Sequence, residues 1–167
     1  MSISLSSLVS SSQLTLGTAV SLSGTAVGFT GIPAGVKEIQ MILQGASVTG
    51  TDDLIIQLGS GSYTTTGYNS YTIALQNTSP TVSGVTSTTG FNIPSGSATS
   101  SIYGIAKFVN ITGNIWVGSI SVGGIYTTQF SFLVNGSISL SGVLDRIRIT
   151  VSGSNTFDAG AVNISYQ

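Results

Sequence analysis

The chain has 167 residues, enough for one domain with a sizeable hydrophobic core, and its net charge is −1. Charged residues make up only 5% of the sequence, against about 25% in an average globular domain, so we expect no basic surface for nucleic-acid phosphates. Because His and Cys are both absent, zinc sites built on imidazole or thiolate, Ser-His-Asp and Cys-His catalytic centres and disulfides are excluded, and we expect neither catalysis nor a cofactor.

The N-terminal residues form a separate feature of the sequence. Ile3, Leu5, Leu14 and Leu16 alternate with polar residues on either side of a serine cluster at residues 10–12, which is typical of an extended segment. This segment is either an extra strand or an arm that pairs with a neighbouring chain. The first 20 residues carry no positive side chain and no unbroken apolar stretch, so no export signal is predicted.

Short stretches of alternating hydrophobicity, bounded by turn residues, follow one another through the rest of the chain. In residues 38–44, for example, Ile39, Met41 and Leu43 share one face of a predicted strand. The other candidate strands are residues 53–58, 71–76, 91–93, 101–109, 115–122, 126–134, 137–140, 146–151 and 161–166. The predicted turns between them include residues 59–61, 95–96, 123–124, 135–136 and 152–155.

This pattern predicts an all-β protein. No ten-residue window has the periodicity of an amphipathic helix, and about ten strands at this spacing indicate a sandwich or a barrel. We place the domain at residues 26–167 and the arm or extra strand at residues 1–25. No run of about 18 apolar residues occurs, so we expect no insertion into a membrane.

Residues 59–101 are rich in Thr, Ser and Gly and are expected to form long loops around two short strands. Tyr63, Tyr68 and Tyr71 lie in this segment. Exposed tyrosines stack on sugar rings and form protein interfaces, so a glycan or interface contact is one interpretation of them, and packing in the core is the other. Trp116 lies in an apolar strand and is expected in the core.

Two groups of charged residues are candidate sites. Asp145, Arg146 and Arg148 form the densest charge cluster, which indicates a salt bridge or an ion-pair contact between chains. Asp52 and Asp53 are adjacent at the start of a strand, so their side chains diverge. Hydrogen bonds that cap a turn are the preferred interpretation of these two carboxylates, and a calcium ion bound to one of them is the alternative.

The scarcity of charge also bears on assembly. Exposed sheet edges are normally protected by charged residues or proline, and this chain has only four Lys and Arg and three Pro. Nearly neutral surfaces promote association. We therefore expect a stable oligomer in which edges and apolar faces are covered.

Four segments of the sequence carry a resemblance to a known family. They are IPAGVKEI (32–39), GTDDLIIQLG (50–59), SGVLDRIRIT (141–150) and FDAGAVNI (157–164). Together they resemble domains at the C-terminal ends of tail-fibre and other virion structural proteins of tailed bacteriophages, especially marine and cyanobacterial ones. The resemblance implies a jelly-roll-like antiparallel β-sandwich that forms a homotrimer on a virion, and it implies no enzyme.

The expected function is that of a non-enzymatic structural protein on the surface of a tailed-phage virion, synthesised in the cytoplasm of a bacterial host. The family domain usually follows a long shaft, whereas only about 25 residues precede it here, so a head decoration or cement protein and a short fibre both remain open. Its expected partners are itself and other virion proteins, such as those of the capsid or tail. The alternative is a receptor-binding fibre tip or a lectin-like module that recognises glycans of the host surface.

Overall fold

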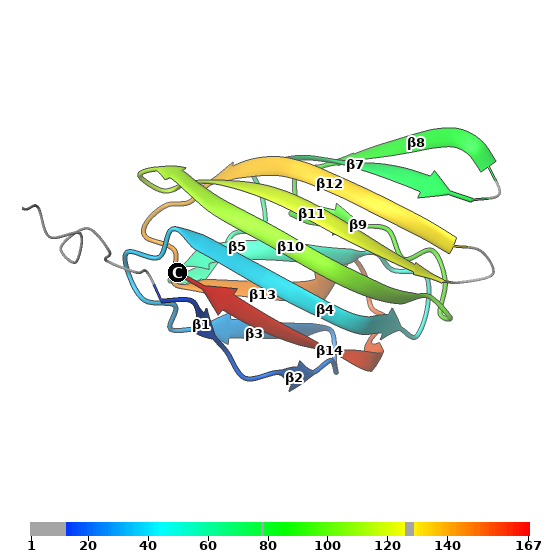
Figure 1. Ribbon diagram of the computed structural model, residues 1–167, viewed down its shortest axis with the longest axis horizontal. Coiled ribbons are helices and arrows are strands. Elements are labelled where there is room, and N and C mark those ends of the chain that lie inside the picture. Colours follow the sequence, from blue (N-terminus) through cyan, green and yellow to red (C-terminus); the bar gives the residue numbers. More distant parts are fainter. Residues whose placement is uncertain (1–12, 78, 126–128) are drawn as a thin grey trace, which may run out of the picture.

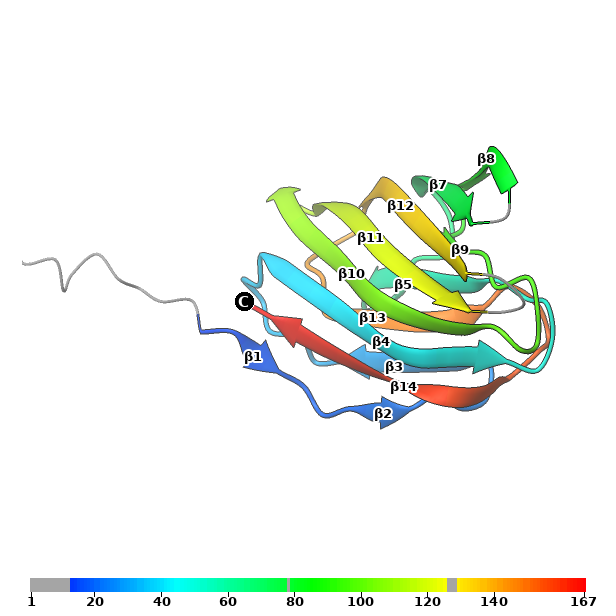
Figure 2. The ribbon, with the colours of Figure 1, turned by 45° about the vertical axis from the view of Figure 1, so that its right-hand side comes forward.

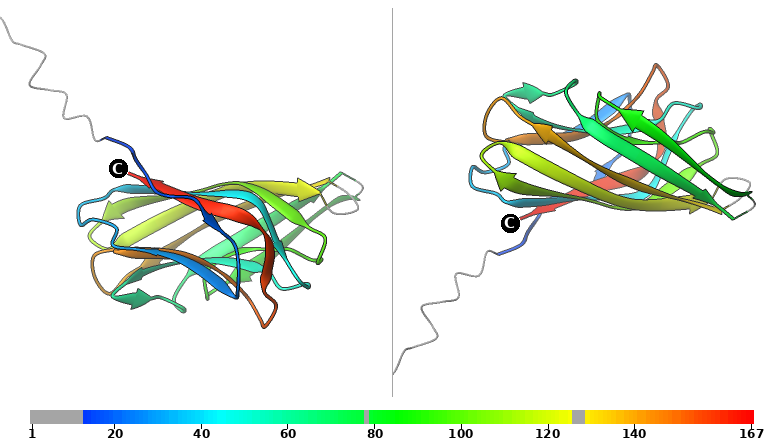
Figure 3. Two further views of the ribbon diagram at one scale, coloured as in Figure 1. Left: turned by 90° about the horizontal axis from the view of Figure 1, so that it is seen from below. Right: turned by 90° about the horizontal axis from the view of Figure 1, so that it is seen from above.

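The computed structural model describes residues 13–77, 79–125 and 129–167, and this part of the chain contains strands and no helix (Figure 1). The strands form a nine-stranded and a five-stranded sheet, which lie as two layers in Figure 3. They number more than the ten or so predicted: β1 (Thr15–Leu16), β2 (Val20–Ser21), β3 (Ala26–Thr30), β4 (Glu38–Val48), β5 (Leu54–Ser60), β6 (Ser62–Tyr63), β7 (Asn69–Gln76), β8 (Ser79–Ser87), β9 (Phe91–Ile93), β10 (Ser101–Thr112), β11 (Ile115–Ile125), β12 (Gln129–Ser139), β13 (Arg146–Val151) and β14 (Phe157–Tyr166).

The strand order is that of a jelly roll with two insertions. The large sheet runs β1-β14-β4-β10-β11-β12-β7-β8, with β2 also paired to β14, and the small sheet runs β3-β13-β5-β6, with β9 also paired to β5. The strands β2-β14-β4-β10 and β3-β13-β5-β9 make the two four-stranded layers of a jelly roll. The predicted jelly-roll-like sandwich is therefore confirmed, and β11, β12, β7 and β8 widen the large sheet beyond it.

The core lies between the two sheets and follows the predicted alternation. Ile39, Met41 and Leu43 of β4 point inward and are buried, as are Ile147 and Ile149 of β13. Each fully buried aliphatic side chain stabilises the fold by about 1.5–3 kcal/mol. The apolar faces predicted for these strands are therefore the faces that hold the sheets together.

Aromatic side chains fill the middle of the core. The rings of Phe91 and Phe108 lie 5.1 Å apart, Tyr68 packs edge-on against Phe91, and Trp116 is buried as predicted. Gly118 faces these rings from β11. A Cβ there would lie 2.6 Å from Phe91 and 2.8 Å from Phe108, so the aromatic pair requires a residue without a side chain.

Two predicted turns are wrong. Residues 123–124 belong to β11, and residues 135–136 lie inside β12, so residues 137–139 of the separately predicted strand 137–140 are the end of β12. Gly136 sits where β12 and β7 approach closely, since a Cβ there would lie 2.6 Å from the Cα of Ser70. These glycines allow close packing of neighbouring strands rather than a change of direction. Residues 126–128, where the predicted strand 126–134 begins, lie outside the described residues.

The long loops predicted within residues 59–101 are also largely wrong. This segment contains β6, β7, β8 and β9, and β7 and β8 form an antiparallel hairpin at one edge of the large sheet. Figure 2 shows the hairpin on the side of the molecule opposite β1 and β2. The many Thr residues of this segment favour strands, because a β-branched side chain fits a half-exposed pleated surface.

The N-terminal residues that the structure describes add to the other edge of the same sheet. Thr15 and Leu16 pair with the end of β14, and β2 pairs with its middle. The part of the predicted arm at residues 1–12 lies outside the described residues. None of the described residues belongs to a helix that is long and apolar enough to cross a membrane.

Tyr68 closes a gap in the backbone hydrogen bonding of β5. β9 pairs with residues 54–56 and β6 with residues 59–60, so Leu58 lies between these two partners. The Tyr68 hydroxyl accepts the Leu58 N–H at 2.8 Å and is 3.1 Å from the Thr64 carbonyl oxygen, to which it can donate. Burial raises the pKa of Tyr68 to about 12, so the hydroxyl keeps its proton for this bond.

We predict that Tyr68→Phe lowers the free energy of unfolding by about 1–3 kcal/mol, because the buried Leu58 N–H loses its acceptor. Chemical denaturation of both proteins measures this difference. Tyr103→Phe is the matched control, because Tyr103 is 53% exposed and the change should stay within about 0.5 kcal/mol. Equal effects of the two substitutions would contradict the role given to Tyr68.

Candidate functional site

The three tyrosines predicted as glycan or interface contacts lie in three different places. Tyr63 packs on the outer face of the small sheet, Tyr68 is buried in the core, and Tyr71 is exposed on the outer face of the large sheet. Burial removes Tyr68 from the surface contacts. Tyr63 and Tyr71 lie on opposite faces of the sandwich, so the three rings cannot line one glycan site.

The predicted charge cluster does come together, on the outer face of the small sheet. Asp145 and Arg146 form a two-pronged ion pair, with Nε to Oδ1 at 2.8 Å and a terminal nitrogen to Oδ2 at 3.1 Å. The Asp145 carboxylate also accepts the N–H of Gly61, which ties the β5–β6 turn to β13. The pair is thus a contact within one chain.

Tyr63 organises the two arginines of this cluster. Its ring centroid lies 4.5 Å from the guanidinium carbon of Arg148 and 5.7 Å from that of Arg146. Gly28 makes room for the ring, since a Cβ at this position would lie 3.1 Å from Cζ of Tyr63. Arg148 also donates from Nε to Oε1 of Gln57 at 2.8 Å. The small sheet therefore carries an ordered polar network on its outer face.

Asp52 and Asp53 diverge as predicted, and each caps a turn. Asp52 accepts the N–H of Asn155 at 2.8 Å, whereas Asp53 accepts the side-chain amide of Asn92 at 2.9 Å and the N–H of Ser95 at 3.3 Å. The turn-capping interpretation is confirmed. Within the described ranges no three acidic side chains gather into a group that could hold a metal ion.

The outer face of the large sheet carries ten of the sixteen exposed large hydrophobic side chains among the described residues. We use "outer face" for the outward residues of β4, β10, β11, β12 and β7. Neighbouring strands place Ile42, Ile105, Ser121, Leu133 and Ile73 in one row across it. Its exposed apolar side chains are Tyr71, Leu75, Tyr103, Ile105, Val109, Ile111, Ile115, Val117, Ile125 and Leu133. Of these outward positions only Tyr71 was singled out in the sequence, as a possible glycan or interface contact, although the same alternation that located the core defines them all.

Charge is nearly absent from the outer face. The five strands that form it contain only Glu38 and Lys107, and these two form an ion pair of 2.9 Å on the side of the face where β4 and β10 lie. The remaining outward positions are largely aliphatic residues, Ser and the uncharged amides Asn and Gln. Strands of 11 or 12 residues and five strands at the usual spacing give the face an area of roughly 800 Å². That is about what one partner contributes to a standard protein interface.

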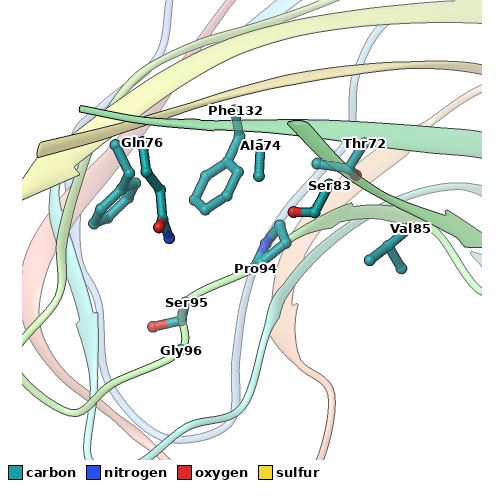
Figure 4. A pocket seen from close by; sticks show the side chains of 10 residues that line it. Thr72, Ala74, Gln76, Ser83, Val85, Pro94, Ser95, Gly96 and Phe132 are labelled. Carbon is teal, nitrogen blue, oxygen red and sulfur yellow. The ribbon is translucent and has the colours of Figure 1, made fainter. Parts of the chain in front are cut away.

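A pocket lies where the large sheet extends past the small one. Figure 4 shows Ala74, Gln76 and Phe132 on one side of it and Pro94 and Ser95 of the β9–β10 loop on the other. Its volume is about 290 Å³. Thr72, Ser83, Val85, Gly96 and Phe130 complete the lining. The pocket is therefore a mainly apolar recess beneath the β7–β8 hairpin.

Two carboxyl groups in ion pairs make stability depend on pH. The hydrogen bond from Arg146 lowers the pKa of Asp145 below its ordinary 3.8, and hydrogen bonds from Gln40 and then Lys107 lower the pKa of Glu38 below its ordinary 4.5. A carboxyl whose pKa is lower in the folded protein stabilises the fold above its unfolded pKa. This contribution is lost as the pH falls through the folded pKa.

We predict that Tm falls between about pH 6 and pH 2 and that the double variant Glu38→Gln/Asp145→Asn shows a smaller fall. Scanning calorimetry at both pH values measures the difference. Asp158→Asn changes an exposed carboxyl of β14 and serves as control. If Tm falls by the same amount between the two pH values in the original protein, the double variant and the control, the two ion pairs do not contribute to the pH dependence of stability.

Comparison with known proteins adds no relative. No family model, no curated protein and no solved structure matches the chain. Among the described residues, exposed large hydrophobic side chains are most numerous on the outer face, which makes it the main candidate for a contact with a partner.

Proposed function

We propose that the protein is a non-enzymatic structural protein that assembles into a homotrimer on the surface of a tailed-phage virion. The observation that carries the self-association is the outer face of the large sheet, on which Glu38 and Lys107 are the only charged residues and neutralise each other. Monomeric proteins rarely expose contiguous apolar patches larger than a few hundred Å². Ile125 is 61% exposed and Ile105 46% exposed on this face, so both lose much apolar surface when a partner covers it.

The composition of the outer face favours a partner of the same kind. A face with one ion pair and otherwise aliphatic, Ser, Asn and Gln residues offers little to a charged partner, because burying an unpaired charge against it is unfavourable. A second copy presents the same neutral surface. Short Ser side chains lose little conformational entropy on packing, which suits a permanent contact.

The trimeric state and the virion location rest on the sequence resemblance at residues 32–39, 50–59, 141–150 and 157–164. A protein of this kind contacts other virion proteins, those of the capsid if it decorates the head or those of the tail if it is a short fibre. The number of copies per purified particle separates the two, because hundreds indicate a head protein and a few tens or fewer indicate a fibre.

We predict that the protein is a trimer at micromolar concentration and that Ile105→Lys/Leu133→Lys weakens assembly at least about 30-fold, because each lysine would be buried without a partner. Sedimentation equilibrium measures the association, and circular dichroism verifies that the variant is folded. Val143→Lys is the control, since Val143 is 59% exposed in the loop between β12 and β13. A monomeric original protein, or an unaffected double variant, would overturn the proposal.

We also predict that assembly persists in about 1 M salt. Salt screens exposed ion pairs but leaves apolar contacts largely intact, and the outer face carries one ion pair. Light scattering across a salt series measures the mass. Dissociation at high salt would mean that the Asp145, Arg146 and Arg148 cluster, rather than the outer face, forms the contact.

A further inference from the structure

β8 is an unprotected edge of the large sheet. Among the described strands it pairs only with β7, so one side of its backbone is unpaired. Natural edge strands usually carry charge or proline. β8 has no charged residue, and its one proline, Pro80, lies near its start. Residues 82–87 therefore contain neither charge nor proline to protect the edge. Val82 and Val85 are 63% and 48% exposed. This edge can accept a further strand of low charge.

The pocket beneath β8 can accept side chains from such a strand. Ser83 and Val85 pair with Ala74 and Thr72, and all four side chains line the pocket, so the inner side of the edge opens into it. Its volume of about 290 Å³ is twice the roughly 150 Å³ of a cavity that holds one benzene molecule. The pocket therefore has room for about two aliphatic side chains.

Residues 1–12 of the chain have the sequence that this edge requires. In MSISLSSLVSSS, the odd-numbered side of an extended chain holds Ile3, Leu5 and Val9 beside Ser7, and the other side holds serines with Leu8 as its one apolar residue. The segment has no charged residue and no proline. Added beside β8, it would turn its apolar side toward the pocket and its serines toward solvent.

If residues 1–12 crossed the sheet to β8 of their own chain, almost none of them would remain to pair with that strand. It precedes β1, which lies at the opposite end of the strand order from β8, seven strand spacings away. At about 4.8 Å per spacing this is roughly 34 Å, and twelve extended residues span at most about 40 Å. Figures 1 and 2 both show β1 and β8 at opposite edges of the large sheet. The strand that pairs with β8 must therefore come from another copy.

We infer that residues 1–12 of one copy add as a strand to β8 of a neighbouring copy, with Ile3 and Leu5 in the pocket beneath the β7–β8 hairpin. The inference rests on the proposed self-association and names the segment that links one subunit to the next. Strand addition of this kind gains affinity from backbone hydrogen bonds and specificity from the alternate side chains that enter a pocket.

The absence of cysteine allows a direct test in the full-length chain. One chain carries Ser4→Cys, and a second chain with an affinity tag carries Thr86→Cys, which lies on the solvent side of β8 beside Tyr71. The two are mixed under conditions that allow exchange and treated with a short bis-maleimide, which tolerates a shift in register. The control replaces Thr86→Cys with Ser154→Cys, in the exposed turn before β14.

We expect at least about a fivefold greater yield of the cross-linked heterodimer with Thr86→Cys than with Ser154→Cys. Adding Val85→Lys to the tagged chain, or Ile3→Ser/Leu5→Ser to the other, should reduce the yield to that of the control. Native mass spectrometry reports the assembly separately. A trimer without preferential cross-linking would overturn the strand addition but leave the proposed function intact, whereas a monomer would overturn both.

Discussion

The two sheets of this protein have unequal widths, and most of its surface properties depend on that mismatch. The five-stranded sheet covers the jelly-roll part of the nine-stranded sheet, and only β9 lies near β12, β7 and β8. Phe130 and Phe132 on the inner side of β12 are buried, but they border a recess rather than a second layer. The insertions thus create a wide sheet with one broad face, one uncovered edge and one apolar pocket.

The distribution of the few charges complements this architecture. Asp52 and Asp53 cap turns, and Asp145, Arg146 and Arg148 lie on the small sheet, where Tyr63 and Gln57 hold the arginines. Glu38 of β4 and Lys107 of the neighbouring β10 neutralise each other. Charge therefore gathers where side chains meet polar partners and leaves the outer face and β8 neutral. On a protein that remained monomeric, such surfaces would favour unspecific aggregation.

Glycine and tyrosine both differ here from their usual interpretation in a sequence. Gly118 and Gly136 lie inside strands because a neighbouring ring or backbone comes too close for a Cβ. Tyr68, which belongs to a Thr- and Ser-rich segment, supplies a hydrogen bond that two short strands fail to supply to β5. In both cases the residue is required by a contact with a residue distant in the sequence. A local sequence pattern does not contain that contact, and it therefore favours a turn for glycine and the surface for tyrosine.

The sequence alone determined the fold class, the inward faces of β4, β5 and β13, and the neighbourhood of Asp145 and Arg146, because alternation and adjacency along a strand are local properties. Only the tertiary structure decided that Tyr63, Tyr68 and Tyr71 lie apart, that Arg148 stacks on Tyr63, and that β7 and β8 extend the large sheet. These features depend on which strands become neighbours. Strand order follows from the burial of whole faces between two sheets, and no single segment carries that information.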